Sequence, residues 1–225
     1  MKMIPILIAG GVLGAFAIGG VSLVAVTNAM TVGRIAAGER AAMIAKLQAI
    51  VPEGSIANDP MADRIEVQDP ELLGGKTTDV YRVRKDGEGV AVILNPIVPD
   101  GYAGPIKLLV AVMKDGSLGG VRVLSHHETP GLGDRIEEQR PYKWDSAGDP
   151  MVWVLGFAGK SLSDPPLPKW GVKRDGGEFD QFTGATITPR SVVKAVKNAM
   201  LFVQEQGDAL YAPAPAPTAT NGGAS

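Results

Sequence analysis

Residue types suited to binding chemistry gather in one short stretch, residues 180–190. Pro189 favours the first turn of a helix and Thr188 is a typical N-cap, so the sequence predicts a helix that begins just after Thr186. Unpaired N–H groups and the positive end of the helix dipole then face the preceding loop. Such a place binds anions, phosphate above all.

The loop before this helix is small and hydroxylated. Gly184 and Ala185 would let a phosphate approach the backbone, and Thr183 and Thr186 offer hydroxyls beside it. Two interpretations remain open from these residues alone: a site for a phosphate-bearing ligand, or a capped helix after an ordinary turn. A threonine hydroxyl is a poor nucleophile unless it is activated, and no Ser-His-Asp set surrounds Thr186 in the sequence.

A second stretch, residues 125–133, reads Ser-His-His-Glu-Thr-Pro-Gly-Leu-Gly. Adjacent histidines do not easily face one metal from a regular element, and the chain has no cysteine, so we expect no metal site. Gly131 and Gly133 permit a tight loop. Without a third glycine they are not a dinucleotide fingerprint. On its own, the stretch also fits a Pro-Gly surface turn.

Together these stretches resemble a known family. Asp180-x-x-Thr183-Gly184-Ala185-Thr186 resembles the flavinylation motif of the FMN-binding domain family. The longer run over residues 175–189 is similar to the G subunit of Rnf electron-transport complexes. The C subunit of the sodium-pumping NADH:quinone reductase is a close relative. The resemblance extends to the apolar N-terminus, the predicted hairpins and residues 128–133.

The resemblance implies a covalent cofactor. In the family, a flavin transferase takes FMN from FAD and joins its phosphate by a phosphoester to the last threonine of the motif, here Thr186. Asp180 is then either recognised by the transferase or a local turn former. Residues expected near the cofactor are Thr183, Gly184, Ala185, Ile187 and Thr188 of the motif, and Glu128, Thr129, Gly131, Leu132 and Gly133 beside the flavin ring.

Side chains outside the two stretches could also reach this cofactor. Trp170, ten residues before Asp180, could cover the flavin or anchor its own loop. Lys169, Lys173 and Arg174 could attract the phosphate or be solvated. The carboxylates are scattered, so we see no paired general acid and base.

The function implied by the resemblance is electron relay within a membrane complex that couples ferredoxin and NAD to ion movement. The chain would act as an electron carrier, with the other Rnf subunits as partners. Three alternatives stay open: the C subunit of the sodium-pumping reductase, a flavin enzyme that reduces a small substrate, and a non-redox membrane-anchored scaffold.

Composition supports an anchored globular protein. The chain has 225 residues, a net charge of -2 and 45% apolar residues. It shows no basic excess that would indicate nucleic acid as a partner. The absence of cysteine excludes disulfides and thiolate-bound metals.

The N-terminal segment predicts a membrane anchor. No charged residue lies between Lys2 and Arg34, and residues 6–26 suffice to cross a bilayer. We expect a transmembrane anchor over residues 1–33 rather than a cleaved signal peptide. The flanking positive charges lean towards a cytoplasmic C-terminal domain. The resemblance instead implies the bacterial inner membrane, with the domain on the periplasmic side.

The remainder predicts one α+β domain over residues 34–211, built on antiparallel hairpins. A helix should continue over 34–51 until Pro52 and Gly54 stop it. Hairpins are expected at 80–94 across Asp86-Gly87 and at 106–124 across Asp115-Gly116. Further elements are a strand over 151–157 and a helix over 189–205. Residues 212–225, rich in Pro and Ala, are expected to be disordered.

Overall fold

The structure is a computed structural model that describes residues 3–212, apart from the side chains of residues 5 and 6. The chain divides into two units, Met1–Ala45 and Lys46–Ser225. The expected disordered tail lies outside the described residues from position 213 onward. The last described residue, Ala212, is bound to the strand β2 (Thr78–Lys85), because its carbonyl oxygen accepts hydrogen bonds from Arg82 and Arg84.

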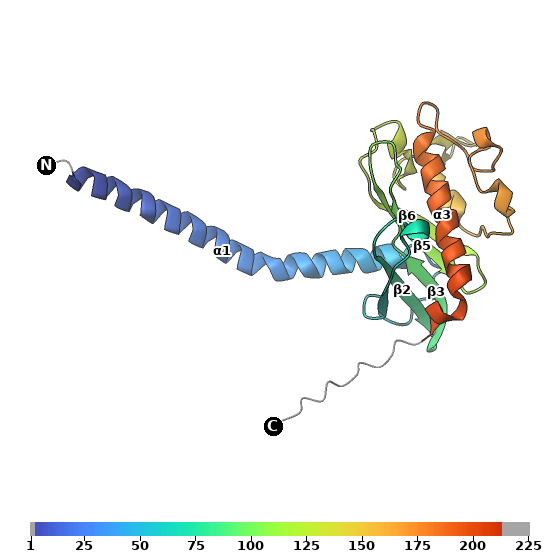
Figure 1. Cartoon of the computed structure of the whole chain (residues 1–225), viewed down its shortest axis with the longest axis horizontal. Helices are drawn as coiled ribbons and strands as arrows, with labels where there is room; N and C mark the ends of the chain where they lie inside the picture. The colour runs from blue at the N-terminus through green and yellow to red at the C-terminus, as the bar shows by residue number, and fades with distance from the viewer. Residues whose placement is uncertain (1–2, 213–225) are drawn as a thin grey trace, which may run out of the picture. The chain divides into compact units, whose positions relative to one another are not determined.

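The N-terminal unit consists of most of α1, which runs Met3–Gln48 (Figure 1). By length and composition α1 can cross a membrane, and its large apolar side chains between Leu7 and Ile35 are exposed. Exposed apolar side chains over this length suit a lipid environment. The helix continues past residue 34, as predicted, and ends before Pro52 and Gly54.

The globular unit is built on a six-stranded antiparallel sheet (Figure 1). Its strands are β1 (Arg64–Val67), β2 (Thr78–Lys85), β3 (Glu88–Leu94), β4 (Ile97–Val98), β5 (Ile106–Met113) and β6 (Leu118–Ser125). They pair in the order β1-β2-β3-β5-β4, and β6 pairs with β5. Both predicted hairpins are confirmed. Asp86 and Gly87 have φ of 53° and 84°, as a two-residue I′ turn requires.

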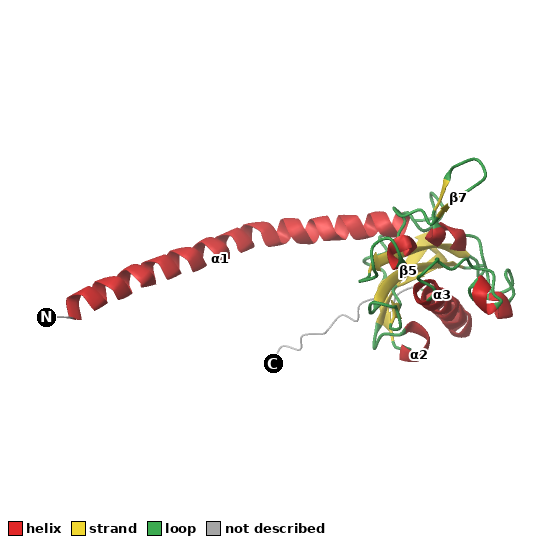
Figure 2. Cartoon of the chain, turned by 90° about the horizontal axis from the view of Figure 1, so that it is seen from above, coloured by secondary structure: helices red, strands yellow, loops and turns green. Residues whose placement is uncertain are grey.

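The long C-terminal helix α3 (Ile187–Gln206) shares the main core with the sheet. Alternate residues of β3 and β5 and one side of α3 supply this core: Val92, Leu94, Leu108, Val110, Val112, Val192, Val196, Ala199, Met200 and Val203. The short helix α2 (Pro70–Leu73) lies on the same side of the sheet as α3 (Figure 2). Ile50 lies against Gly119 and Gly120 of β6. The α+β class is as predicted.

One predicted strand, residues 151–157, is wrong. Only its start is extended, in β8 (Pro150–Met151), which pairs with β7 (Lys143–Trp144). The rest is the 3₁₀ helix η2 (Trp153–Phe157). Trp153, Val154 and Phe157 are buried while Leu155 is exposed, which is helical rather than alternating spacing. An edge-to-face contact of Trp153 with Phe157, at 5.1 Å, stabilises the turn.

The remaining elements are short 3₁₀ helices. They are η1 (Gly133–Ile136), η3 (Leu167–Lys169), η4 (Lys173–Asp175) and η5 (Gly207–Tyr211). The β7–β8 hairpin projects from the unit (Figure 2). The irregular chain between β6 and α3 therefore carries most of the loops that surround the start of α3.

Candidate functional site

A cavity of about 510 Å³ lies at the N-terminal end of α3. It is lined by Tyr102, Glu128, Thr129, Leu132, Gly133, Arg174, Gly184, Ala185, Thr186 and Ile187. The two stretches singled out in the sequence, about fifty residues apart, thus line one cavity. Eight of the lining residues were predicted to lie near the cofactor; Tyr102 was not, and Arg174 was one of three candidate cations.

The loop before α3 is a tight turn on an aromatic base. The amide of Ala185 donates to the carbonyl oxygen of Phe182 at 3.1 Å, and Gly184 has φ of +82°. A positive φ at the third position of such a turn favours glycine. Phe182 is buried and packs against Trp153 with ring centroids 5.3 Å apart. The packing of Phe182 thus holds the turn in place, while Thr183 and Gly184 are exposed to solvent.

Thr186 occupies the N-cap position of α3. Its backbone is helical, with φ of −78° and ψ of −28°, and among the described residues its side chain makes no capping hydrogen bond. The Thr186 hydroxyl is therefore not committed to the helix and lines the cavity. The first N–H groups of α3 lie beside this hydroxyl, so the partial positive charge of the helix N-terminus is close to the Thr186 side chain.

Thr188 is not the N-cap that the sequence predicted. The helix begins one residue before it, and Thr188 is buried in the first turn. Its hydroxyl donates to Oε2 of Glu128 at 2.5 Å. Pro189 still lies in the first turn, as predicted, where a missing N–H is not needed for helical pairing.

Glu128 ties three segments together at the base of the cavity. Its side chain is 5% exposed, Oε1 accepts from the Ala103 amide at 3.1 Å and Oε2 accepts from Thr188. The Glu128 amide donates to Nδ1 of His126. A Cβ at Gly133 would lie 2.5 Å from Oε2, so the loop needs glycine at this position for close approach.

The rim of the cavity combines apolar side chains with one cation. Tyr102, Leu132 and Ile187 are 68%, 41% and 44% exposed, unusual values for large apolar or aromatic groups that line a cavity. A signal for Tyr102 existed in the sequence, since it is an aromatic residue in a glycine-containing loop. Its approach to the cavity depends on tertiary contacts that the sequence does not display.

Of the three candidate cations, Arg174 alone lines the cavity. Lys169 donates to the carbonyl oxygen of Gly176 at 3.0 Å, and Lys173 pairs with Asp180 at 2.6 Å. Arg190, in α3, forms an ion pair with Asp175. The structure therefore selects Arg174 as the side chain placed to meet an anion.

Asp180 is engaged on both carboxylate oxygens. Oδ2 accepts from the Tyr142 hydroxyl at 2.7 Å and from Lys143 at 2.5 Å, and Oδ1 faces Lys173. Burial alone would raise the pKa of the Asp180 carboxyl, but hydrogen bonds from Lys143, Lys173 and Tyr142 outweigh it and hold the pKa well below its usual range. The hydrogen bond to Asp180 in turn raises the pKa of Lys143.

Four predicted residues do not line the cavity: Thr188, which is buried beside Glu128, and also Thr183, Gly131 and Trp170. Thr183 lines a smaller neighbouring cavity of about 260 Å³, together with Arg135 and Lys143. Gly131 has φ of +78° and shapes the loop without lining the cavity. The expectation for Trp170 needs correction: it is buried against Phe157 and Phe179, and its Nε1 donates to the carbonyl oxygens of Ser161 and Pro165. It anchors its own loop.

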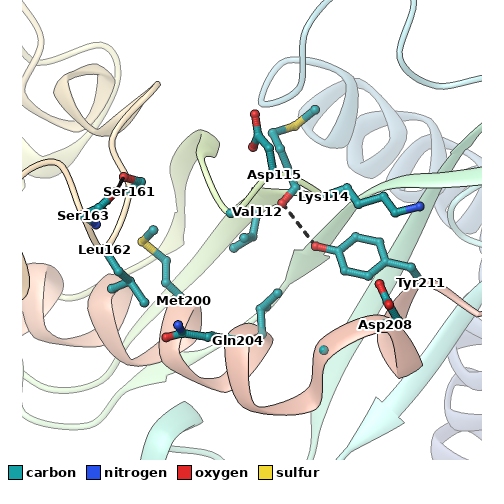
Figure 3. Close-up of a pocket in the computed structure, with 14 residues that line it drawn as sticks. Val112, Lys114, Asp115, Ser161, Leu162, Ser163, Met200, Gln204, Asp208 and Tyr211 are labelled. Atoms are coloured by element: carbon teal, nitrogen blue, oxygen red, sulfur yellow. Dashed lines mark hydrogen bonds between the residues drawn. The ribbon is translucent and has the colours of Figure 1, made fainter.

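A further cavity, of about 570 Å³, lies at the opposite end of α3 (Figure 3). Several of its polar groups are already paired: Tyr211 donates to the carbonyl oxygen of Met113, and the hydroxyls of Ser161 and Ser163 bond to each other. Burial raises the pKa of Tyr211 to about 12. None of the predicted residues lines this cavity, so the chemistry points to the N-terminal end of α3.

Two family models match this chain, and similar proteins align over most of its length. Residues 101–201 match the family model described as the FMN-binding domain, and residues 1–50 match that of the RnfG N-terminal region. A Pseudomonas aeruginosa protein, named as the G subunit of an ion-translocating oxidoreductase complex, is 47% identical over 202 residues, 89% of this chain and 90% of its own length. Proteins of the same name from Vibrio atlanticus and Vibrio cholerae are 42% and 39% identical over 203 residues, 90% of this chain and 92% of their own lengths.

Proposed function

The chain belongs to the family of the G subunits of ion-translocating oxidoreductase complexes, and we propose that it relays electrons through FMN attached by a phosphoester to Thr186. It is one component of a membrane electron-transport complex and carries an FMN-binding domain. The family assignment favours the G subunit of such a complex over the C subunit of a sodium-pumping reductase. The FMN-binding domain argues against a non-redox scaffold.

The lining of the cavity supports this proposal. It includes the N-terminus of α3, Arg174 and Gly184, which has no side chain, and these groups suit a phosphate. The lining also includes Leu132 and Tyr102, which suit a planar ring. Bound FMN supplies one- or two-electron transfer, while the protein supplies holding and electrostatics. Glu128 holds the Ala103 loop and the start of α3 in place at the cavity.

The single observation that carries the proposal is the uncommitted hydroxyl of Thr186 at the start of α3. Attachment from FAD forms a bond from Thr186 Oγ1 to the FMN phosphorus and breaks the bond between the two phosphates, so AMP leaves. The hydroxyl proton needs a base. Glu128, the carboxylate lining the cavity, is committed to Ala103 and Thr188. An external flavin transferase that brings its own base and Mg²⁺ fits this arrangement.

Mass spectrometry tests the attachment. Cleavage after Arg174 and Arg190 releases residues 175–190, which contain Thr183, Thr186 and Thr188. In protein from a host with the transferase, fragmentation should place the FMN phosphoryl group on Thr186. Thr186→Ala should fold without flavin, whereas Thr183→Ala should keep it. A flavin still covalently attached to the Thr186→Ala chain would refute the assignment.

The wider role follows from the complex named for the relatives. We propose that the chain passes electrons to or from neighbouring subunits in a route between ferredoxin and NAD, with α1 in the bacterial inner membrane and the globular unit on the periplasmic side. The native chain has no cysteine, so a single Ser146→Cys reports the topology. A membrane-impermeant maleimide should label Ser146→Cys in intact spheroplasts and leave Met3→Cys unlabelled; the reverse pattern would place the globular unit in the cytoplasm.

A further inference from the structure

The carboxylate of Asp180 lies between two lysines that come from different loops. Lys143 is the first residue of β7 and Lys173 the first of η4, and each approaches a different oxygen of Asp180, at 2.5 Å and 2.6 Å. The side chain of Asp180 is 22% exposed, and those of Lys143 and Lys173 are 43% and 57% exposed. One carboxylate therefore bridges two ammonium groups and ties both loops to the chain just before the Thr186 turn.

The same residue is held through its main chain. The indole Nε1 of Trp153 donates to the carbonyl oxygen of Asp180 at 2.8 Å. Two residues later, Phe182 packs against Trp153 and against Tyr142, with ring centroids 5.3 Å and 6.1 Å apart. Tyr142 is also a hydrogen-bond donor to the Asp180 carboxylate. The groups that fix Asp180 are thus the groups on which Phe182 rests.

Phe182 begins the turn that leads to Thr186. Its carbonyl oxygen accepts from Ala185, and the carbonyl oxygen of Thr186 accepts from Arg190 in the first turn of α3. Displacement of Phe182 would therefore move the turn and the N-cap together. The path from the Asp180 carboxylate to the Thr186 hydroxyl runs through packed aromatic rings and backbone hydrogen bonds.

Loss of the Asp180 charge would leave Lys143 and Lys173 facing each other without a counter-ion. The two ammonium groups would then repel each other. In wild type, both carboxylate oxygens of Asp180 are already in contact with donors, which leaves few acceptor positions for an incoming protein. We propose that Asp180 is a positioning residue: it holds the β7–β8 hairpin and the η4 loop against the Thr186 turn by pairing with both Lys143 and Lys173, and the flavin-attaching enzyme recognises the resulting turn rather than the carboxylate. This rests on the proposed attachment at Thr186.

Removal of the two cations that Asp180→Asn leaves unpaired tests the proposal. Full-length protein in detergent is incubated with purified flavin transferase, FAD and Mg²⁺, and in-gel flavin fluorescence gives the attachment rate. Asp180→Asn should slow attachment on the order of tenfold. The triple variant D180N/K143M/K173M should recover most of the wild-type rate, because no unpaired cation remains. The matched control D180N/K169M should stay slow, since Lys169 does not contact Asp180 in the structure.

A triple variant as slow as Asp180→Asn would overturn the proposal and show that the enzyme contacts the carboxylate directly. Hydrogen exchange gives a readout that needs no flavin: the Ala185 amide should exchange faster in Asp180→Asn and return to the wild-type rate in the triple variant. Unchanged exchange in Asp180→Asn would also overturn it. Absence of flavin on Thr186 in the wild-type chain would instead refute the proposed attachment. The hydrogen exchange of the Ala185 amide would then still test whether Asp180 holds the turn in place.

Discussion

Thr188, in the first turn of α3, donates its hydroxyl proton to the buried carboxylate of Glu128 at 2.5 Å. The two residues are sixty positions apart, and the same carboxylate also holds the Ala103 amide. The start of the helix, the loop after β6 and the loop that presents Tyr102 thus share one acceptor. A buried carboxylate is costly unless it is hydrogen-bonded, which makes this contact a determinant of the shape of the cavity.

Replacement of Thr188 by Val should destabilise the globular unit. Val keeps the shape but leaves one oxygen of Glu128 without its donor, and a hydrogen bond to a charged group contributes about 1.5–3 kcal/mol. The loss is measurable as a lower urea midpoint in tryptophan fluorescence, since all three tryptophans, Trp144, Trp153 and Trp170, lie in the globular unit. Thr188→Ser retains the hydroxyl and should unfold near the wild-type midpoint. Equal midpoints for Val and wild type would contradict the role assigned to this bond.

Gly133→Ala should disturb the same carboxylate from the other side. The added Cβ would lie 2.5 Å from Glu128 Oε2 and 2.9 Å from Glu128 Cβ, so the side chain must shift. Overpacking of this kind costs about 1–3 kcal/mol and should also reduce FMN loading. Gly156→Ala is the matched control, because a Cβ there meets nothing within 4 Å. The prediction fails if the Gly133→Ala and Gly156→Ala chains unfold at the same urea concentration.

The elements that sequence could predict are those determined by local chemistry. Asp-Gly pairs specify both hairpins because positive φ is required in their turns, and the apolar period over residues 189–205 specifies α3. The convergence of residues 128–133 with the Thr186 loop was expected from family resemblance, not from spacing. The burial of Glu128 against Thr188 was missed, because a threonine before a proline is locally an equally good N-cap.

The errors share a tertiary cause. Residues 151–157 are apolar enough for a strand, but Trp153 and Phe157 pack edge to face and favour a 3₁₀ turn. Trp170 was a candidate ring contact, yet Phe157 and Phe179 offer it a buried aromatic environment that only the folded chain brings together. Tyr102 reaches the cavity through a loop held by Glu128 and by Ser191, whose hydroxyl donates to the carbonyl oxygen of Asp100.

Acid should weaken the Asp180 contacts in a defined direction. The pKa of Asp180 is lowered from 3.8 in the folded chain, so its contribution is present above that value and is lost as pH falls through the folded pKa. The pKa of Lys143 is raised from 10.5, so its contribution is lost only as pH rises through the raised value. The contribution is therefore constant between roughly pH 5 and pH 9.

The measurement is the difference in urea midpoint between wild type and Asp180→Asn as a function of pH. Because the lysines are about half exposed, the difference at pH 7 should be on the order of 1 kcal/mol. It should shrink as pH falls below 3.8, towards the lowered pKa of Asp180 in the folded chain. Asp115 and Asp175, whose pKa values are also lowered, titrate in both chains and cancel. A difference that grows on acidification would contradict the sign of the shift.

Arg174 should speed the attachment of FMN through charge. It is the candidate cation that lines the cavity beside Thr186, whereas Lys169 is bonded to Gly176 and Lys173 to Asp180. Arg174→Gln should slow flavin attachment about threefold at low salt. The effect is small because the attraction between an exposed side-chain charge and a phosphate is weak in water. The difference from wild type should vanish at high ionic strength. Lys169→Gln removes the same charge from the neighbouring loop and should match wild type at both salt concentrations. If Arg174→Gln and Lys169→Gln slow attachment equally, the general charge of the loop guides the phosphate, not the Arg174 side chain at the cavity.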